Sequence, residues 1–214
     1  MRLFGPSGSS DGWSRTGGPA RPAITDGGLP RQDRRTLSAG DSGTGNRPAI
    51  PIADSRRCND VIATSTAVYA EEAVTIEERL AWFRLRRQQG YPVLVATDDS
   101  GVIGFISFGD FRAWPCYLHS VEHSVHVRAD RRRHGVGRAL MESLIPRACA
   151  LGKHILIAGI DADNAGSLRL HQSLGFEQVA HLREVGRKFD RWLDLVFMQR
   201  FLNAPGAPPS RPAL

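Results

Sequence analysis

The chain has 214 residues, a formal net charge of +6 and 41% hydrophobic residues, a length that suits one ordinary domain with additional segments. No apolar run approaches the ~18 residues of a membrane span, and no apolar signal-peptide core follows Met1. We therefore expect a cytoplasmic protein.

The positive charge is concentrated in residues 1–58. This segment has nine arginines against five aspartates, whereas the rest of the chain has 19 basic and 17 acidic residues. A nucleic-acid-binding domain carries its basic excess on the folded part, so we expect no nucleic-acid partner. The cysteines, Cys58, Cys116 and Cys149, form no Cys-x-x-Cys pair, which is typical of a reduced cytosolic protein.

Residues 1–58 also differ from the rest in composition. They hold 10 of the 22 glycines and 6 of the 13 prolines, and they lack apolar periodicity. Such a segment is expected to be disordered. We expect one folded domain over residues 59–202 and a flexible tail, rich in proline and alanine, over residues 203–214.

The expected elements begin with a helix. Thr75 and Glu78 have the spacing of a capping box and predict a helix through Gln89. Apolar alternation and turn residues then predict further strands, two more helices and a final strand pair. The strands span residues 91–97, 102–108, 120–128, 154–160, 177–185 and 192–201, and the helices follow Gly135 and Asn164. This order predicts an α/β (α+β) domain around a mixed sheet.

A glycine-bearing turn joins the strand at 120–128 to the next helix. Gly135 and Gly137 allow a ligand to approach the main chain, and the first N–H groups of a helix point outward with a positive dipole. The sequence adds four arginines: Arg131, Arg132, Arg133 and Arg138. Together these features suit a pyrophosphate. Alone, the motif fits a surface helix start with solvated arginines equally well, and it is neither a Walker A loop nor a Rossmann fingerprint.

Three features in this order resemble the GNAT superfamily of acetyl-CoA-dependent N-acetyltransferases, over roughly residues 59–202. They are the strand–Arg132-x-x-Gly135-x-Gly137–helix unit, the apolar strand after it, and Asn164-x-x-Ser167-x-x-x-His171-x-x-x-Gly175-Phe176. The stretches SVEHSVHV, AGIDADNAGSLRLHQSLGF and VGRKFDRWLDLVFMQ resemble the phosphinothricin and methionine sulfone/sulfoximine branch. The resemblance implies acetylation of the α-amine of a small amino-acid analogue by a homodimer, with acetyl-CoA as co-substrate and no metal.

The resemblance also implies catalytic residues. Glu122 lies where the branch has its proposed general base, in a strand whose alternation groups it with Ser124 and His126. Enclosure would raise the pKa of this carboxylate, although the pattern alone also fits a solvated glutamate. His171 falls where the superfamily often has a tyrosine, so it could act as an acid, orient the thioester or be structural. His123 is expected to face away from Glu122.

Binding residues follow from the same resemblance. Acetyl-CoA is expected to contact the main chain of a strand, the glycine turn and an asparagine that is also an ordinary N-cap. These residues are Val125, His126, Val127, Arg132, Arg133, His134, Gly135, Val136, Gly137, Arg138 and Asn164. The acceptor pocket is expected to include Tyr69, Arg112, Tyr117 and Glu122. Trp114 stands where the phosphinothricin enzymes carry a second basic residue, which favours a methionine sulfone-like acceptor.

The sequence departs from the family before Asn59. GNAT domains open with a strand and a helix there, but residues 51–58 lack the apolar helix, so we expect the first strand to be missing or degenerate. A frame error, a mis-set start or a genuine variant would each explain this. Two alternatives to an amino-acid N-acetyltransferase remain. One is a protein or peptide N-terminal acetyltransferase, and the other is a degenerate acetyl-CoA-binding protein.

Overall fold

The computed structural model describes residues 22–27, 73–204 and 206. These residues form one seven-stranded sheet in the order β1-β2-β3-β4-β5-β7-β6. The strands are β1 (Ala23–Asp26), β2 (Val93–Asp98), β3 (Gly101–Asp110), β4 (Ser120–Val127), β5 (Ile155–Asp161), β6 (Glu177–Lys188) and β7 (Arg191–Phe201). The helices are α2 (Ile76–Gln88), α3 (Val136–Ala150) and α4 (Ala165–Ser173), with short 3-10 turns η1 (Pro115–Tyr117) and η2 (Ala129–Arg131).

The predicted capping box starts α2. The Thr75 N–H donates to the Glu78 carboxylate at 2.8 Å, and the Glu78 N–H donates to the Thr75 hydroxyl at 3.2 Å. Two of the free N–H groups at the helix start are thereby satisfied. Phe83 is the buried apolar residue of this helix, and it fixes the face that α2 turns to the sheet.

The sheet is mixed, as the sequence predicts. β1, β2, β3 and β4 pair antiparallel in succession, β4 pairs parallel to β5, and β5, β7 and β6 pair antiparallel. A parallel pair needs a crossover connection, and α3 supplies it between β4 and β5. The apolar β5 has strands on both sides, which confirms its predicted interior position.

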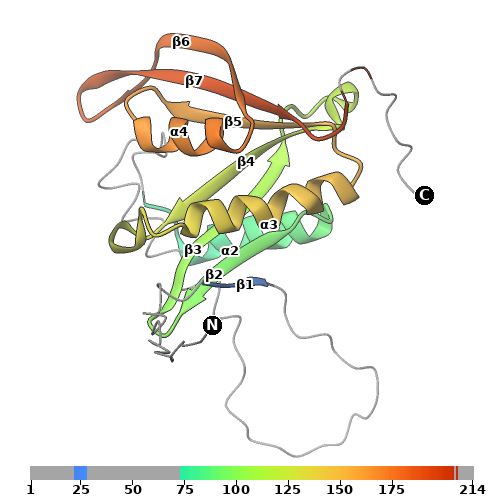
Figure 1. Ribbon diagram of the computed structural model, residues 1–214, viewed down its shortest axis with the longest axis vertical. Coiled ribbons are helices and arrows are strands. Elements are labelled where there is room, and N and C mark those ends of the chain that lie inside the picture. The colour runs from blue at the N-terminus through green and yellow to red at the C-terminus, as the bar shows by residue number, and fades with distance from the viewer. Residues whose placement is uncertain (1–21, 28–72, 205, 207–214) are drawn as a thin grey trace, which may run out of the picture.

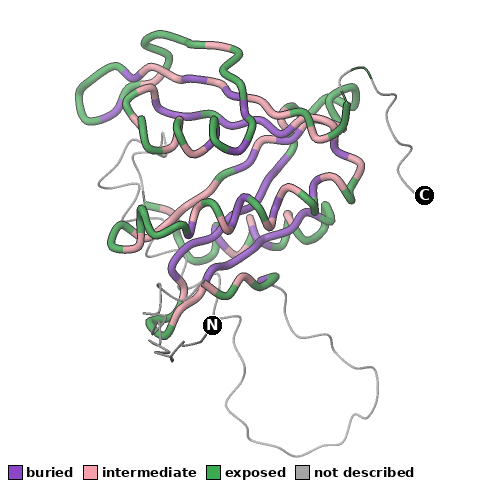
Figure 2. Tube along the Cα trace, in the orientation of Figure 1, coloured by how far each residue is buried: buried purple, intermediate pink, exposed green. Residues whose placement is uncertain are grey.

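Helices cover both faces of the sheet (Figure 1). The buried residues Leu140, Met141 and Leu144 of α3 belong to the same core as Ile106 and Val121 of the strands. α2 lies on the other face, where its Trp82 ring is 6.3 Å from that of Phe105. The buried residues follow the central strands and the inner side of α3 (Figure 2).

The parallel pair is short. In the described part of the chain, β4 and β5 are in register only from Ser120 to Glu122, which lie opposite Ile155 to Ile157. Beyond Glu122 the two strands diverge (Figure 1), although β4 continues to pair with β3 on its other edge. The β5-facing edge of β4 from Val125 onward is therefore left without a strand partner among these residues.

The first strand, expected to be missing or degenerate, is present as the four-residue strand Ala23–Asp26, and the expectation that all of residues 1–58 are disordered does not hold for these residues. These residues form β1, which pairs with β2 at the sheet edge, and the Gly27 N–H donates to the Val93 carbonyl at 2.8 Å. β1 has four residues, of which only Ile24 is apolar and partly buried, and Pro22 and Gly27 flank it. Four residues are too few for apolar alternation to be recognised in the sequence. The strand forms through main-chain pairing with β2 and not through burial of its side chains.

No helix in residues 22–27, 73–204 or 206 is both long enough and apolar enough to span a membrane.

Candidate active site

A cavity of about 540 Å³ opens where β4 and β5 diverge. It lies between the end of β4, the start of α3 and one side of α4. Most of the residues that the sequence predicted as acetyl-CoA contacts come together around it. Its lining comprises Val125, His126, Val127, Arg132, Arg133, Gly135, Gly137, Arg138, Asn164, Gly166, Ser167, Arg169 and Leu170.

The glycine turn has the geometry of an anion site. Gly135 is the N-cap of α3 with φ 79°, a left-handed conformation that residues with a Cβ rarely adopt, and no side chain caps this helix. The first helical hydrogen bond runs from the Ala139 N–H to the Gly135 carbonyl. The N–H groups of the three residues between them therefore have no partner within the helix and remain available to a ligand.

Four arginines line the cavity: Arg132, Arg133, Arg138 and Arg169. Arg138 also donates to the Ser173 hydroxyl at 2.6 Å, which ties α3 to α4. Arg169 was not predicted as a ligand contact. Arg169 follows Gly166 by three residues, so the two lie on the same face of α4, near the Asn164 cap. This spacing could have predicted that Arg169 faces the cavity.

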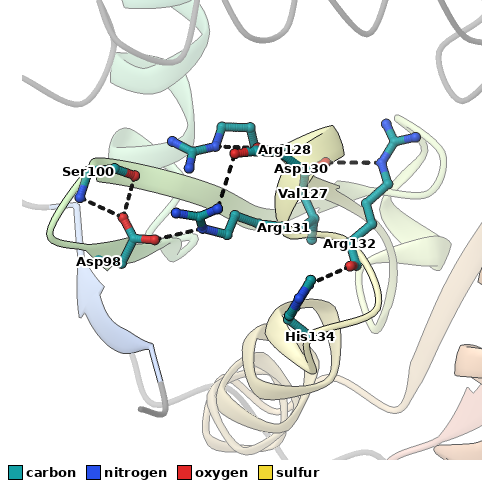
Figure 3. Close-up of polar contacts among 8 residues, drawn as sticks. All are labelled: Asp98, Ser100, Val127, Arg128, Asp130, Arg131, Arg132 and His134. Atoms are coloured by element: carbon teal, nitrogen blue, oxygen red, sulfur yellow. Dashed lines mark hydrogen bonds and ion pairs between the residues drawn. The ribbon is translucent and has the colours of Figure 1, made fainter. Parts of the chain in front are cut away.

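Arg131, in contrast, is held elsewhere (Figure 3). Its Nε donates to Asp98 at 2.9 Å and its Nη1 donates to Asp130 at 3.2 Å. Asp98 in turn accepts from the Ser100 N–H at 2.8 Å within the β2–β3 turn. These bonds hold the pKa of Asp98 well below its usual range, the Ser100 hydroxyl contributing most. Arg131 thus anchors the loop before α3 to the β2–β3 turn instead of facing the cavity.

Two predicted contacts do not appear in the cavity lining. The His134 ring is exposed, and its Nδ1 donates to the Arg132 carbonyl at 2.7 Å (Figure 3), which stabilises the turn. The Val136 side chain is buried in the core, so only its main chain, in the first turn of α3, could meet a ligand. Asn164 lines the cavity and is also the N-cap of α4, because its side-chain oxygen accepts from the Ser167 N–H at 3.1 Å.

Glu122 is half-buried and is the last residue of β4 in register with β5, three residues before Val125. Its Oε1 lies close to Gly159 of β5, at 2.9 Å from the position that a Cβ of residue 159 would take. Burial raises the pKa of Glu122, and the positive charge of Arg112 partly opposes this rise. A half-buried carboxylate with a raised pKa is suited to accept a proton.

Aromatic side chains gather around Arg112 and Phe111. The Arg112 guanidinium lies 4.4 Å from the centre of the Phe111 ring, and the Phe111 ring is 6.2 Å from that of Tyr117 and 6.3 Å from that of Phe197. Trp114 is 75% exposed. The sequence did not predict Phe111 and Phe197, because their contact joins the residue after β3 to β7, which lies far along the chain. The predicted residue Tyr69 lies outside the described residues.

His171 lies away from the cavity lining. Its ring is 1% exposed and stacks on the ring of His123, with 5.0 Å between the centres. Its Nδ1 is 2.7 Å from the Ser167 carbonyl, and its Nε2 is 3.2 Å from Nε2 of His123. A carbonyl only accepts, so Nδ1 of neutral His171 carries the proton and its Nε2 accepts from His123. Burial lowers the pKa of both rings, which keeps them neutral.

Comparison with known proteins places these features in a family. Residues 58–176 match the model of the acetyltransferase (GNAT) family. The chain is 46% identical over 152 residues to the L-methionine sulfoximine/L-methionine sulfone acetyltransferase of Pseudomonas paraeruginosa, covering 71% of this chain and 88% of that protein. It is 35% identical over 145 residues to a phosphinothricin N-acetyltransferase of Streptomyces coelicolor, covering 66% and 85%. A Sinorhizobium meliloti phosphinothricin acetyltransferase, solved in complex with acetyl-CoA, superposes with a TM-score of 0.76 at 28% identity and covers 90% of this chain and 95% of that one.

Proposed function

Because the chain belongs to the GNAT family of acetyltransferases, we propose that it transfers the acetyl group of acetyl-CoA to the α-amine of a small amino-acid analogue, with Glu122 as general base. The acceptor would be of the methionine sulfone, methionine sulfoximine or phosphinothricin type, as in the relatives. One observation carries this proposal. A half-buried carboxylate with a raised pKa lies where β4 and β5 part, next to the β4 residues that line the cavity.

The cavity suits acetyl-CoA in its charge and its shape. The pyrophosphate can lie at the glycine turn. The arginines that line the cavity can neutralise its charge there, and the free N–H groups at the start of α3 can donate hydrogen bonds to it. The pantetheine arm is an extended chain with two amide groups. It can therefore lie along Val125–Val127, whose edge lacks a strand partner among the described residues, much as an added strand would.

The chemistry needs a neutral amine next to the thioester. Glu122, directly or through a water molecule, accepts a proton from the ammonium group, and the freed lone pair attacks the acetyl carbonyl carbon. The C–N bond forms, and negative charge develops on the carbonyl oxygen, where a main-chain N–H of Val125–Val127 can donate to it. The C–S bond then breaks, and the CoA thiolate leaves and takes up, directly or through water, the second proton that the attacking nitrogen releases.

The acceptor pocket is formed by Arg112 and the rings around it. The Arg112 guanidinium can bind the acceptor carboxylate with two parallel hydrogen bonds. Phe111, Tyr117 and Phe197 supply an apolar wall for the acceptor side chain. Tyr69 is proposed as a further contact on the basis of the resemblance. The exposed Trp114 adds no charge, which favours methionine sulfone over the more anionic phosphinothricin.

For His171 we infer the orienting role rather than the acid role. Both of its nitrogens are engaged by Ser167 and His123, and no proton on Nε2 faces the cavity. The pair instead holds α4 against β4. Since Ser167 and Leu170 of α4 line the cavity, this contact fixes the position of the wall against which the thioester arm would lie.

The acceptor class is tested by measuring CoA release with purified protein. Methionine sulfone, methionine sulfoximine, phosphinothricin and a peptide with a free N-terminus are compared as acceptors. We expect the highest kcat/KM for methionine sulfone and the lowest for the peptide, because Arg112 needs a free carboxylate beside the amine. A clear preference for phosphinothricin would remove the inference drawn from Trp114. A preference for the peptide would favour the N-terminal acetyltransferase, and tight acetyl-CoA binding without turnover would favour the degenerate binding protein.

We further propose that the enzyme acts in the cytoplasm as a homodimer that binds neither nucleic acid nor membrane, as expected from the sequence and the resemblance. Size-exclusion chromatography with light scattering tests the dimer directly, and a monomeric mass across the micromolar range would contradict it.

A further inference from the structure

Gly159 lies in the middle of β5, where its backbone does not require glycine. Of the described glycines, those with a left-handed φ are Gly90, Gly101, Gly135, Gly152, Gly175 and Gly206, and Gly159 is not one of them. Glycine weakens a strand interior, because it adds conformational freedom to the unfolded chain and offers no side chain to pack. In a strand, such a glycine often marks a place where another group approaches closely.

The approaching group is the carboxylate of Glu122. A Cβ at position 159 would lie 2.9 Å from Oε1 of Glu122, a distance that real Cβ atoms essentially never show. The same Cβ would lie 3.6 Å from Cδ1 of Leu195 and 3.6 Å from Cε1 of Phe197, which are ordinary contacts. The Glu122 carboxylate thus borders a notch that the missing side chain of Gly159 leaves open, and Leu195 and Phe197 of β7 border the same notch.

We propose that Gly159 is a positioning residue for Glu122, because the notch left by its missing side chain seats the carboxylate at the point where β4 and β5 part. The inference rests on the proposed role of Glu122 as the base. A general base must lie within about 2.6–3.2 Å of the group from which it takes a proton, or one water molecule away. A methyl group in the notch moves the carboxylate out of that position.

The first test is kinetic and uses a double-mutant cycle. We expect Gly159→Ala to lower kcat at least tenfold while the Kd for acetyl-CoA stays unchanged. The acid limb of the pH profile should move to lower pH, because the displaced carboxylate is better solvated. In a Glu122→Gln background, the same Gly159→Ala substitution should cause little further loss, because no base remains to be displaced.

A second pair of variants isolates the steric cause. Asp is one methylene shorter than Glu, so its carboxylate retracts from the notch. Gly159→Ala should therefore reduce kcat much less in a Glu122→Asp background than in the wild-type protein. A loss by the same factor in the wild-type, Glu122→Gln and Glu122→Asp backgrounds would overturn the inference, as would a change confined to the KM for the acceptor.

A third measurement does not depend on activity. The Tm change caused by Gly159→Ala should be less favourable when Glu122 is present than in a Glu122→Ala background, where no carboxylate has to move. Equal Tm changes in both backgrounds would contradict the close approach. If Glu122→Gln alone keeps the wild-type kcat, Glu122 is not the general base. The Tm result then still decides whether Gly159 seats the Glu122 side chain.

Discussion

At the residue scale, two opposing effects act on the pKa of Glu122. Burial favours its protonated form, whereas the positive charge of Arg112 favours the carboxylate. A general base is active only when it is deprotonated, so under the proposed mechanism the pKa of Glu122 sets the lowest pH at which the enzyme works well. Arg112 therefore has two proposed tasks, to bind the acceptor carboxylate and to keep the base ionised.

Removing the charge of Arg112 should separate these tasks. We expect Arg112→Met to raise the KM for the acceptor and to move the acid limb of kcat/KM upward by up to about one pH unit, because the pKa of Glu122 rises further. Arg112→Lys keeps a positive charge and should keep the limb close to its wild-type position, even if the acceptor binds more weakly. An acid limb that stays in place in Arg112→Met would argue against Glu122 as the titrating base.

The buried His123–His171 pair makes a different prediction. His171→Phe leaves the Nε2–H of His123 without its partner, and an unsatisfied buried group costs about 1–3 kcal/mol of unfolding free energy. Urea unfolding should show this loss, whereas the alkaline limb of the kcat profile should persist at the same pH. Loss of that limb would instead support His171 as the acid that protonates the thiolate.

At the element scale, the loop before α3 is fixed by contacts at a distance from the cavity. Arg131 joins this loop to the β2–β3 turn through Asp98, and Arg132 donates to the Val127 carbonyl at 3.3 Å (Figure 3). The glycine turn therefore has its geometry before any ligand arrives, so less conformational entropy is lost on binding.

Asp98→Ala should weaken acetyl-CoA binding several-fold without changing kcat at saturating acetyl-CoA. Loss of the negative charge alone would tighten binding of a phosphate ligand, so a higher Kd reports the loss of the anchor. Asp99→Ala is the matched control, since the neighbouring Asp99 is exposed in the same turn. Isothermal titration calorimetry measures the Kd for acetyl-CoA of both variants. Equal Kd values would show that the Arg131–Asp98 contact is not needed for binding.

Local patterns predicted most elements because their signals are local. The capping box at Thr75, the glycine stop at Gly90 and the strand alternation each depend on residues a few positions apart, and the structure confirms these elements to within a few residues. The approach of Glu122 to Gly159 and the contact of Phe111 with Phe197 depend on strand pairing between distant segments. β1 was missed because its four residues are a strand only through their pairing with β2.

At the scale of the whole molecule, buried neutral histidines make stability sensitive to acid. Burial lowers the pKa of His123 and His171, and burial together with the charges of Arg79 and Arg132 lowers the pKa of His126 to about 4. Between the folded and unfolded pKa values the unfolded chain binds more protons than the folded one. Stability therefore falls as the pH drops below about 6.5, the ordinary histidine value.

We expect the unfolding free energy to decrease between pH 7 and pH 5 by up to about 1.4 kcal/mol per pH unit for each such histidine. The raised pKa of Glu122 acts in the opposite sense, because the folded state takes up that proton more readily, and it offsets part of the loss near its own pKa. Urea titrations of the wild-type protein across this range test the prediction. A constant unfolding free energy from pH 7 to pH 5 would contradict it.

The most direct test of the central claim is the rate of CoA release from acetyl-CoA and methionine sulfone by the wild-type protein and by Glu122→Gln, measured with both substrates saturating. Glutamine keeps the size of the side chain and cannot accept the proton. We predict that kcat falls by about 10²- to 10⁴-fold, the usual contribution of general base catalysis, while the Kd for acetyl-CoA stays unchanged. A Glu122→Gln protein that turns over at the wild-type rate would contradict the assignment of Glu122 as the base.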